Sequence, residues 1–210
     1  MAETRTLSQF KNKLAGGGAR PNLFEVSLPS FPSAVEGAWR TGSGRESSQF
    51  SFLCKAAQLP ASTVAEVPVP FRGRTLKVAG DRTFEPWTVT IINDEDFQLR
   101  TAFEQWMNAI SKLNDATGVT NPASYMTDAY VTQLGRGRQA NATRNTGGTS
   151  SELRTYKFYD IFPTEVSAID LSYDSTDTIE EFTVTFQVQY FTIGNSTQGN
   201  RAARGQTLIQ

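Results

Sequence analysis

The chain has 210 residues, 38% of them hydrophobic and 11% aromatic, with 20 lysines and arginines against 21 aspartates and glutamates. This apolar content excludes a disordered chain, and no run approaches the roughly 18 apolar residues of a membrane span. Histidine is absent and cysteine occurs once, at Cys54, which excludes Ser-His-Asp and Cys-His catalytic pairs, histidine-containing metal sites, zinc clusters and an intramolecular disulfide. We expect a folded, non-enzymatic protein with no cofactor and no membrane insertion.

The N-terminal half predicts a series of short strands. Residues 1–18 are polar, end in three consecutive glycines and predict a flexible arm. Strands are predicted at 23–28 and 49–56, on either side of a long loop at 29–48 that is rich in Pro, Gly and Ser. Two runs at 63–69 and 74–78 predict an edge hairpin, because their prolines cannot donate to a central ladder. A tight turn is expected at 79–82, before a strand within 83–92.

One amphipathic helix is predicted next. Asn93 is a favourable N-cap, and the acidic run 94–96 lies where the helix dipole favours negative charge. An apolar stripe at spacings of three and four residues predicts about five turns, ending near residue 114. The members of the stripe are Leu99, Phe103, Trp106, Ile110 and Leu113.

The strand pattern resumes in the C-terminal half. Strands are predicted at 126–134, 153–162 and 167–173, with a loop almost free of apolar residues at 135–151. The clearest strand is 182–190, where apolar residues alternate with Thr and Gln, so that one face is buried and the other is wet. Residues 194–210 predict a second arm.

This order of elements predicts a mainly β protein, an antiparallel β-sandwich or barrel with one flanking α-helix. We expect a single domain at 19–193, with loop insertions near 29–48 and 135–151, between an N-terminal arm at 1–18 and a C-terminal arm at 194–210.

Charge is separated along the chain. The predicted hairpin is basic, whereas residues 156–190 hold one lysine against seven acidic residues. A net charge of −1 argues against general DNA binding, so the hairpin is expected to contact protein, and a head-to-tail assembly that weakens with salt is a hypothesis. Calcium or magnesium binding by the acidic runs is less favoured than helix capping at 94–96 and a solvated turn at 170–181.

Three segments, read together in their order and spacing, carry a family resemblance. They are 19–26 (ARPNLFEV), 52–60 (FLCKAAQLP) and 78–90 (VAGDRTFEPWTVT), and the match continues more loosely through 93–95, 103–106 and 179–190. The chain resembles the tail tube family of T4-like contractile-tailed bacteriophages over most of residues 19–191. The segments 29–48 and 135–151 and the tail beyond residue 191 are longer than in that family.

The resemblance implies six copies per ring and rings stacked into a tube, whose lumen conducts DNA during tail contraction. It implies as partners the protein itself, a tail sheath protein, a baseplate initiator, a tape-measure protein and a tail terminator, with DNA passing through without sequence-specific binding. The expected location is the virion tail, after assembly in the host cytoplasm. Two rivals stay open: the inner tube of a bacteriocin or type VI secretion system, and a ligand-binding β-barrel.

The charge pattern and the resemblance give candidate residues for contacts with other copies and for the core. Candidate contacts between subunits or rings are Arg20, Phe71, Arg72, Arg74, Lys77, Asp81 and Arg82. Candidate core residues are Phe24, Phe52, Cys54, Trp87, Phe103, Trp106, Phe182 and Phe186. We expect Cys54 to be a small buried hydrophobe rather than half of a cross-subunit disulfide.

Overall fold

A computed structural model describes residues 6–13, 18–29, 31–32, 35, 50–135, 151–174 and 176–194. Most of the expected insertions and the C-terminal arm lie outside these residues. By internal contacts the chain divides into two compact units, one comprising 1–25, 132–155 and 193–210, and the other 26–131 and 156–192. The second unit contains the core, the hairpin and two of the helices.

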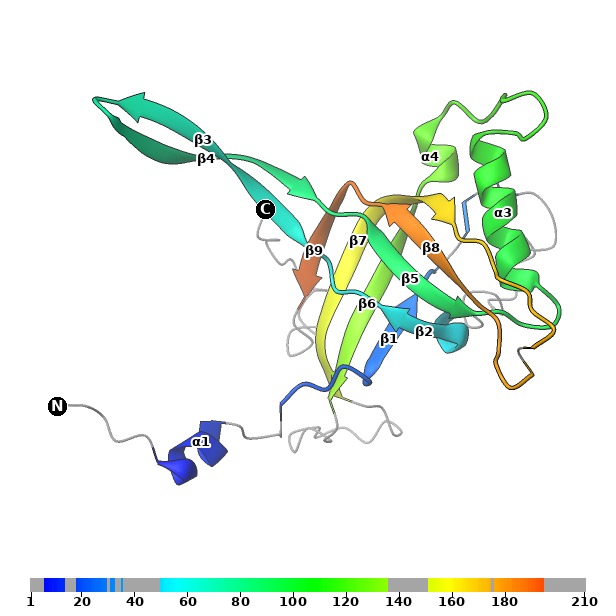
Figure 1. Cartoon of the computed structure of the whole chain (residues 1–210), viewed down its shortest axis with the longest axis horizontal. Coiled ribbons are helices and arrows are strands. Elements are labelled where there is room, and N and C mark those ends of the chain that lie inside the picture. The colour runs from blue at the N-terminus through cyan, green and yellow to red at the C-terminus, as the bar shows by residue number, and fades with distance from the viewer. Residues whose placement is uncertain are drawn as a thin grey trace, which may run out of the picture. The chain divides into compact units, whose positions relative to one another are not determined.

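The described residues are mainly β, and the predicted fold class is confirmed (Figure 1). The helices are α1 (Leu7–Lys13), α3 (Gln98–Ile110) and α4 (Pro122–Tyr125). The strands are β1 (Phe24–Ser27), β2 (Cys54–Ala57), β3 (Ser62–Phe71), β4 (Arg74–Phe84), β5 (Trp87–Ile92), β6 (Thr127–Gly135), β7 (Ser151–Val166), β8 (Glu181–Gln187) and β9 (Tyr190–Gly194). The sequence does not predict α1, which falls within the expected N-terminal arm.

Seven strands form one sheet in the order β1-β6-β7-β8-β5-β2, with β9 paired to β7, while β3 and β4 form a separate two-stranded sheet. The centre of the large sheet is the antiparallel pair β5 and β8. Its register places Trp87 opposite Phe186, Val89 opposite Val184 and Ile91 opposite Phe182. All six side chains are buried, because period-two alternation sends them to one face.

Helix α3 covers part of this apolar face. Phe103 lies 5.8 Å from Phe186 between ring centroids, and Trp106 lies 6.0 Å from the same ring. The indole Nε1 of Trp106 donates a hydrogen bond of 2.7 Å to the carbonyl oxygen of Tyr125. The helix is therefore held by packing and by a satisfied buried donor.

The helix begins later than predicted. Asn93 is not its N-cap: it is buried, and its Nδ2 donates to Glu180 at 3.0 Å. The carboxylate of Asp94 accepts from the backbone N–H of Gln98 at 3.1 Å, so the acidic run precedes the helix instead of forming its first turn. Leu113 lies beyond the end of α3 and is 97% exposed, so its place in the apolar stripe is wrong.

Phe52 is a second correction. Cys54, Trp87, Phe103, Trp106, Phe182 and Phe186 are buried and Phe24 is half-buried, but Phe52 is 84% exposed. Residues 50–53 are helical, not extended. Successive helical residues turn by about 100°, so Phe50 and Cys54 share the inner side while Phe52 points outward.

Two further predictions, one of a turn and one of a strand, also fail. The expected turn at 79–82 lies inside β4, which continues to Phe84. Gly80 lets β3 and β4 approach each other closely there, because a Cβ at this position would lie 3.1 Å from the carbonyl oxygen of Ala65 across the hairpin. Residues 167–173 form no strand, and Leu171 and Tyr173, whose alternation suggested one, are exposed.

The contrast between two phenylalanines gives a stability test. Phe50 is fully buried with its ring 5.9 Å from Phe103, so we expect Phe50→Ala to lower the free energy of unfolding by about 3–5 kcal/mol. The matched control Phe52→Ala should change it by less than about 0.5 kcal/mol. Denaturant unfolding followed by circular dichroism, at a protein concentration too low for assembly, measures both. A larger loss for Phe52→Ala would contradict the helical placement.

Candidate assembly surfaces

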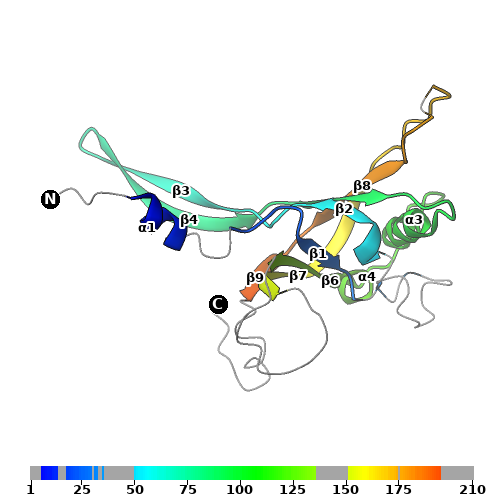
Figure 2. The same cartoon turned by 90° about the horizontal axis from the view of Figure 1, so that it is seen from below.

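Strands β3 and β4 form a hairpin in which the residues of each strand alternate between two faces. A two-residue turn closes it. Arg72 and Gly73 occupy the turn with φ of 45° and 80°, between the paired residues Phe71 and Arg74. Positive φ at both positions suits the right-handed twist of a hairpin, and glycine supplies the second without steric cost. Figures 1 and 2 show the hairpin projecting away from the large sheet of the second unit.

The two faces of the hairpin differ. Directly paired residues share a face, so the pairs Val67–Val78, Val69–Leu76 and Phe71–Arg74 form one face that is apolar apart from Arg74. The other face carries Pro68, Pro70, Thr75 and the ion pair between Lys77 and Glu66 at 2.8 Å. Every residue of β3 is exposed. We define the apolar hairpin face as Val67, Val69, Phe71, Leu76 and Val78.

The base of the hairpin is held by aromatic packing within the second unit. Phe84, at the end of β4, meets the ring of Phe191 in β9 edge-on at 5.4 Å. Phe191 in turn lies 6.3 Å from the buried Phe158. The hairpin therefore has a packed base and a solvated tip.

Six of the seven predicted contact residues lie on this hairpin. Phe71, Arg72, Arg74 and Lys77 are at or near its tip, and Phe71 is 67% exposed beneath the guanidinium of Arg72, at 5.5 Å. Asp81 and Arg82 lie lower on β4. Arg20 belongs to the first unit, where its carbonyl oxygen accepts from Gln133 Nε2 at 2.7 Å. The apolar hairpin face was missed, although alternation at Val67, Val69 and Phe71 signals it.

The outward face of the β5–β8 pair is lined by hydroxyl groups. Thr88 pairs with Thr185 and Thr90 with Thr183, and the Oγ1 atoms of Thr88 and Thr185 are 3.4 Å apart. Lys55 and Glu181, at one end of this face, form an ion pair. The surface is thus polar, with its threonine side chains uncharged.

An ion pair on β6 and β7 extends the polar pattern. Asp128 Oδ2 lies 2.8 Å from Lys157 Nζ, which is also 4.0 Å from the ring centroid of Tyr159. Burial lowers the pKa of Lys157, but the hydrogen bond and charge of Asp128 raise it, and the net shift is upward. Tyr159 stacks on Tyr190 at 4.5 Å. Lys157 therefore remains charged at neutral pH.

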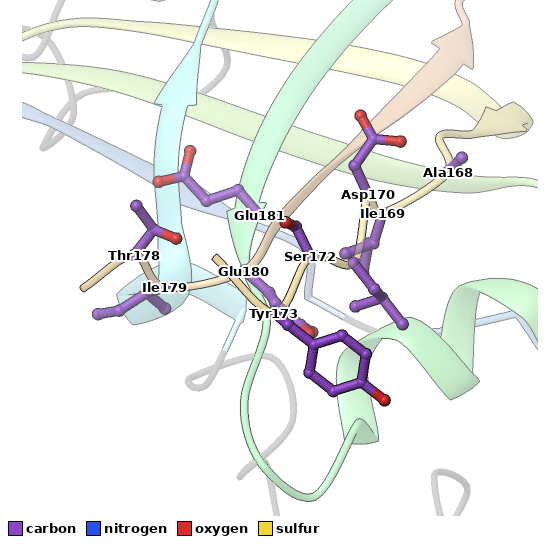
Figure 3. Close-up of a pocket in the computed structure, with 10 residues that line it drawn as sticks. Ala168, Ile169, Asp170, Ser172, Tyr173, Thr178, Ile179, Glu180 and Glu181 are labelled. Carbon is purple, nitrogen blue, oxygen red and sulfur yellow. The ribbon is translucent and has the colours of Figure 1, made fainter. Parts of the chain in front are cut away.

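A hollow of about 610 Å³ lies where the chain crosses from β7 to β8 (Figure 3). Apolar and acidic side chains line it together. The lining residues are Ala168, Ile169, Asp170, Leu171, Ser172, Tyr173, Thr178, Ile179, Glu180 and Glu181. Leu171 and Ile179 are 80% and 71% exposed. This apolar surface lies open to solvent in the single chain.

Metal binding finds no support in the part of the chain that the structure describes. No group of three or more acidic or cysteine side chains is placed to hold an ion there. Among the same residues, no helix is long and apolar enough to cross a membrane.

Cys54 is buried at the start of β2, with its Sγ donating to the carbonyl oxygen of Ala56 at 3.6 Å. Burial raises the pKa of the thiol to about 12 from an ordinary value of 9.0, against a smaller opposing effect of the Ala56 backbone. At pH 8 its thiolate fraction is then about 10³-fold below that of an exposed thiol. The residue is suited to packing, not to reaction.

Thiol labelling tests this placement. At pH 8 we expect a soluble disulfide reagent to react with native Cys54 on the order of 10³-fold more slowly than with the urea-unfolded chain. Absorbance of the released thiol measures both rates. A native rate within about tenfold of the unfolded rate would show that Cys54 is accessible.

Proteins of known structure share the fold of this chain. Its structure superposes on a chain of the cryo-EM structure of the anti-feeding prophage baseplate with a TM-score of 0.57 and 10% identity, covering 85% of this chain and 97% of that one. It also superposes on a chain of the sheath/tube terminator of an extracellular contractile injection system, with a TM-score of 0.52 and 14% identity, covering 84% of this chain and 96% of that one, so the fold is shared with both.

Sequence similarity then gives the family. The chain is 34% identical over 178 residues to the tail tube protein gp19 of Enterobacteria phage T4, covering 84% of this chain and 93% of that protein. It is 24% identical to the tail tube protein of Serratia phage KSP90, covering 89% of this chain and 94% of that protein. A family model described as phage tail tube protein matches residues 19–194. The chain belongs to the phage tail tube protein family.

Proposed function

We propose that this protein is the structural subunit of the tail tube of a contractile phage, assembling into stacked hexameric rings whose lumen conducts DNA into the host. The observation that carries the proposal is the apolar hairpin face. Membership of the tail tube family and the six-fold symmetrised baseplate that shares the fold support it. No catalytic step is required of such a subunit.

The apolar hairpin face needs a partner. A two-stranded sheet is marginally stable alone, and this one exposes paired valines and leucine to water. Large apolar patches of this kind mark interaction surfaces. In a ring or a stack of rings, each copy would bury the face against a neighbour. This supports the hairpin as a contact between subunits or rings; Arg20 and the two arms are proposed as contacts from the family resemblance alone.

The outward face of β5 and β8 suits the lumen. Its four paired threonines offer hydroxyl groups without charge, so they neither repel nor hold a phosphate backbone strongly. Lys55 and Glu181 are paired at one end of this face, and the exposed Glu165 lies opposite Thr185, where its negative charge would not attract a phosphate backbone. DNA would pass such a surface without sequence-specific binding.

The wider assembly follows from this role. A tube within a contractile tail needs a baseplate initiator to begin it, a tape-measure protein to set its length, a terminator to end it and a sheath around it. We propose these as partners, with assembly in the cytoplasm of the host and a final location in the virion tail.

The inner tube of another injection machine is the second candidate. The fold is shared with a chain of the anti-feeding prophage baseplate and with a chain of the cap that terminates the anti-feeding prophage tube. The amount of DNA in purified particles that contain the protein distinguishes a phage tail from a protein-injecting machine.

Negative-stain electron microscopy of the purified protein at rising concentration tests the proposal. We expect rings or hollow tubes of constant diameter, formed alone or after addition of the baseplate initiator. Dispersed globular particles in the presence of that initiator would refute the tube function.

A hairpin variant tests the role of the apolar hairpin face. We expect Val69→Thr with Leu76→Thr to leave the thermal unfolding temperature nearly unchanged, because both side chains are exposed in the single chain. The critical concentration for assembly should rise about tenfold or more, since burying one such side chain contributes about 1.5–3 kcal/mol. Light scattering measures this concentration.

The matched control changes the opposite face of the same hairpin. Thr75→Ser with Ala79→Ser should assemble like the unmodified protein. If both variants assembled normally, the apolar hairpin face would have no role in the tube.

A further inference from the structure

We propose that the hairpin tip of one copy docks into the hollow between β7 and β8 of the next copy, joining copies head to tail through arginine–carboxylate pairs around an apolar contact. The hairpin tip is defined here as Phe71, Arg72 and Arg74, and the acceptor loop as the described residues 167–174 and 176–181. The inference rests on the proposed tube function and names the surface that receives the hairpin.

The acceptor loop has a fixed base. Ser167 and Thr183 exchange two hydrogen bonds of 2.9 Å, one through the Ser167 hydroxyl. Arg100 on α3 donates to the carbonyl oxygen of Ser167 at 3.2 Å. On the other side, the backbone and the side chain of Asn93 donate to Glu180 at 2.9 and 3.0 Å. Both ends of the acceptor loop are therefore held by hydrogen bonds in the single chain.

The rim of the hollow is apolar and acidic together. Leu171 and Ile179 are mostly exposed, and Tyr173 is fully exposed. Residues 167–181 include five acidic residues and no basic one. Glu181 is paired with Lys55, but no ion pair within the described residues involves Asp170, Asp174 or Asp177.

The hairpin tip has the complementary chemistry. Phe71 presents an exposed aromatic ring, with the guanidinium of Arg72 5.5 Å from its centroid and Arg74 as its cross-strand partner. No ion pair within the described part of the chain involves Arg72 or Arg74. Arginine guanidinium groups match carboxylates bidentately, and an aromatic ring in a hollow is the usual centre of a strong interface.

The two surfaces lie at opposite ends of the second unit. The hairpin tip and the crossing from β7 to β8 point away from each other in both views (Figures 1 and 2). A chain therefore cannot satisfy its own acceptor loop with its own hairpin tip. Unlike charges at opposite ends favour a heterologous contact, which propagates from copy to copy, and disfavour joining like ends.

Reciprocal charge reversal tests the pairing by electron microscopy and light scattering. Arg72→Glu with Arg74→Glu, and separately Asp170→Arg with Asp174→Arg, should each raise the critical concentration for tubes about tenfold or more while the chain stays folded. The chain that carries all four changes should recover tube formation. The matched control Glu95→Arg with Asp115→Arg, two exposed acids outside the acceptor loop, should assemble normally.

The outcomes separate the two proposals. If the unmodified protein forms no tubes even with the baseplate initiator, the tube function fails and this inference fails with it. If the unmodified protein forms tubes and the acceptor-loop variant forms them equally well, the loop serves another partner, such as the sheath, and the inference is wrong. It is also wrong if both double variants fail and the fourfold variant does not recover.

A crosslink gives an independent readout. Phe71→Cys protein is mixed with Leu171→Cys protein under mild oxidation, and Cys54 stays inert because it is buried. We expect a disulfide-linked dimer containing one chain of each kind, and far less in either protein alone. Equal yields in the mixture and in the separate proteins would overturn the pairing.

Discussion

The structure depends on the register of β5 against β8. In this register the bulky apolar residues of the two strands lie opposite each other, and so do their threonines. A shift of β8 by one residue would turn Phe182, Val184 and Phe186 to the polar face and bury the hydroxyl groups of Thr183 and Thr185. Helix α3 would then lose the contact between Phe103 and Phe186, and with it part of the packing that orients the helix. The core and the polar face are thus two results of one pairing.

The hairpin depends on that core in turn. Phe84 and Phe191 link its base to Phe158, which stacks on Trp87 at 4.6 Å between ring centroids. A continuous line of aromatic contacts therefore runs from the centre of the sheet to the foot of the hairpin. These contacts tie the foot of the hairpin to the core, while its tip is left exposed for a neighbour.

Strong local patterns predicted the elements best. The alternation around Phe182 and Phe186 predicted β8, and the stripe at Phe103 and Trp106 predicted α3, because burial on one face leaves a periodic record in the sequence. Phe52 was misplaced because the run 50–54 fits a strand and a helical turn equally well, and only its tertiary surroundings decide between them. Gly80 suggested a turn, but it lies within β4, where the absence of a side chain allows the backbone of β3 to come close. The acceptor loop could not be predicted, since its form depends on hydrogen bonds from Asn93 and Arg100, which are distant in the sequence.

The two prolines of β3 have a consequence for solubility. Pro68 and Pro70 lack backbone N–H groups, and proline is tolerated in a ladder where that group would point away from the partner strand. The free edge of β3 therefore offers two fewer donors to an incoming strand. A hairpin that exposes valine, leucine and phenylalanine can then adhere through its side chains while resisting the edge-to-edge pairing that begins amyloid fibrils. The same short segment thus combines an exposed apolar face with a strand edge that is poor in hydrogen-bond donors.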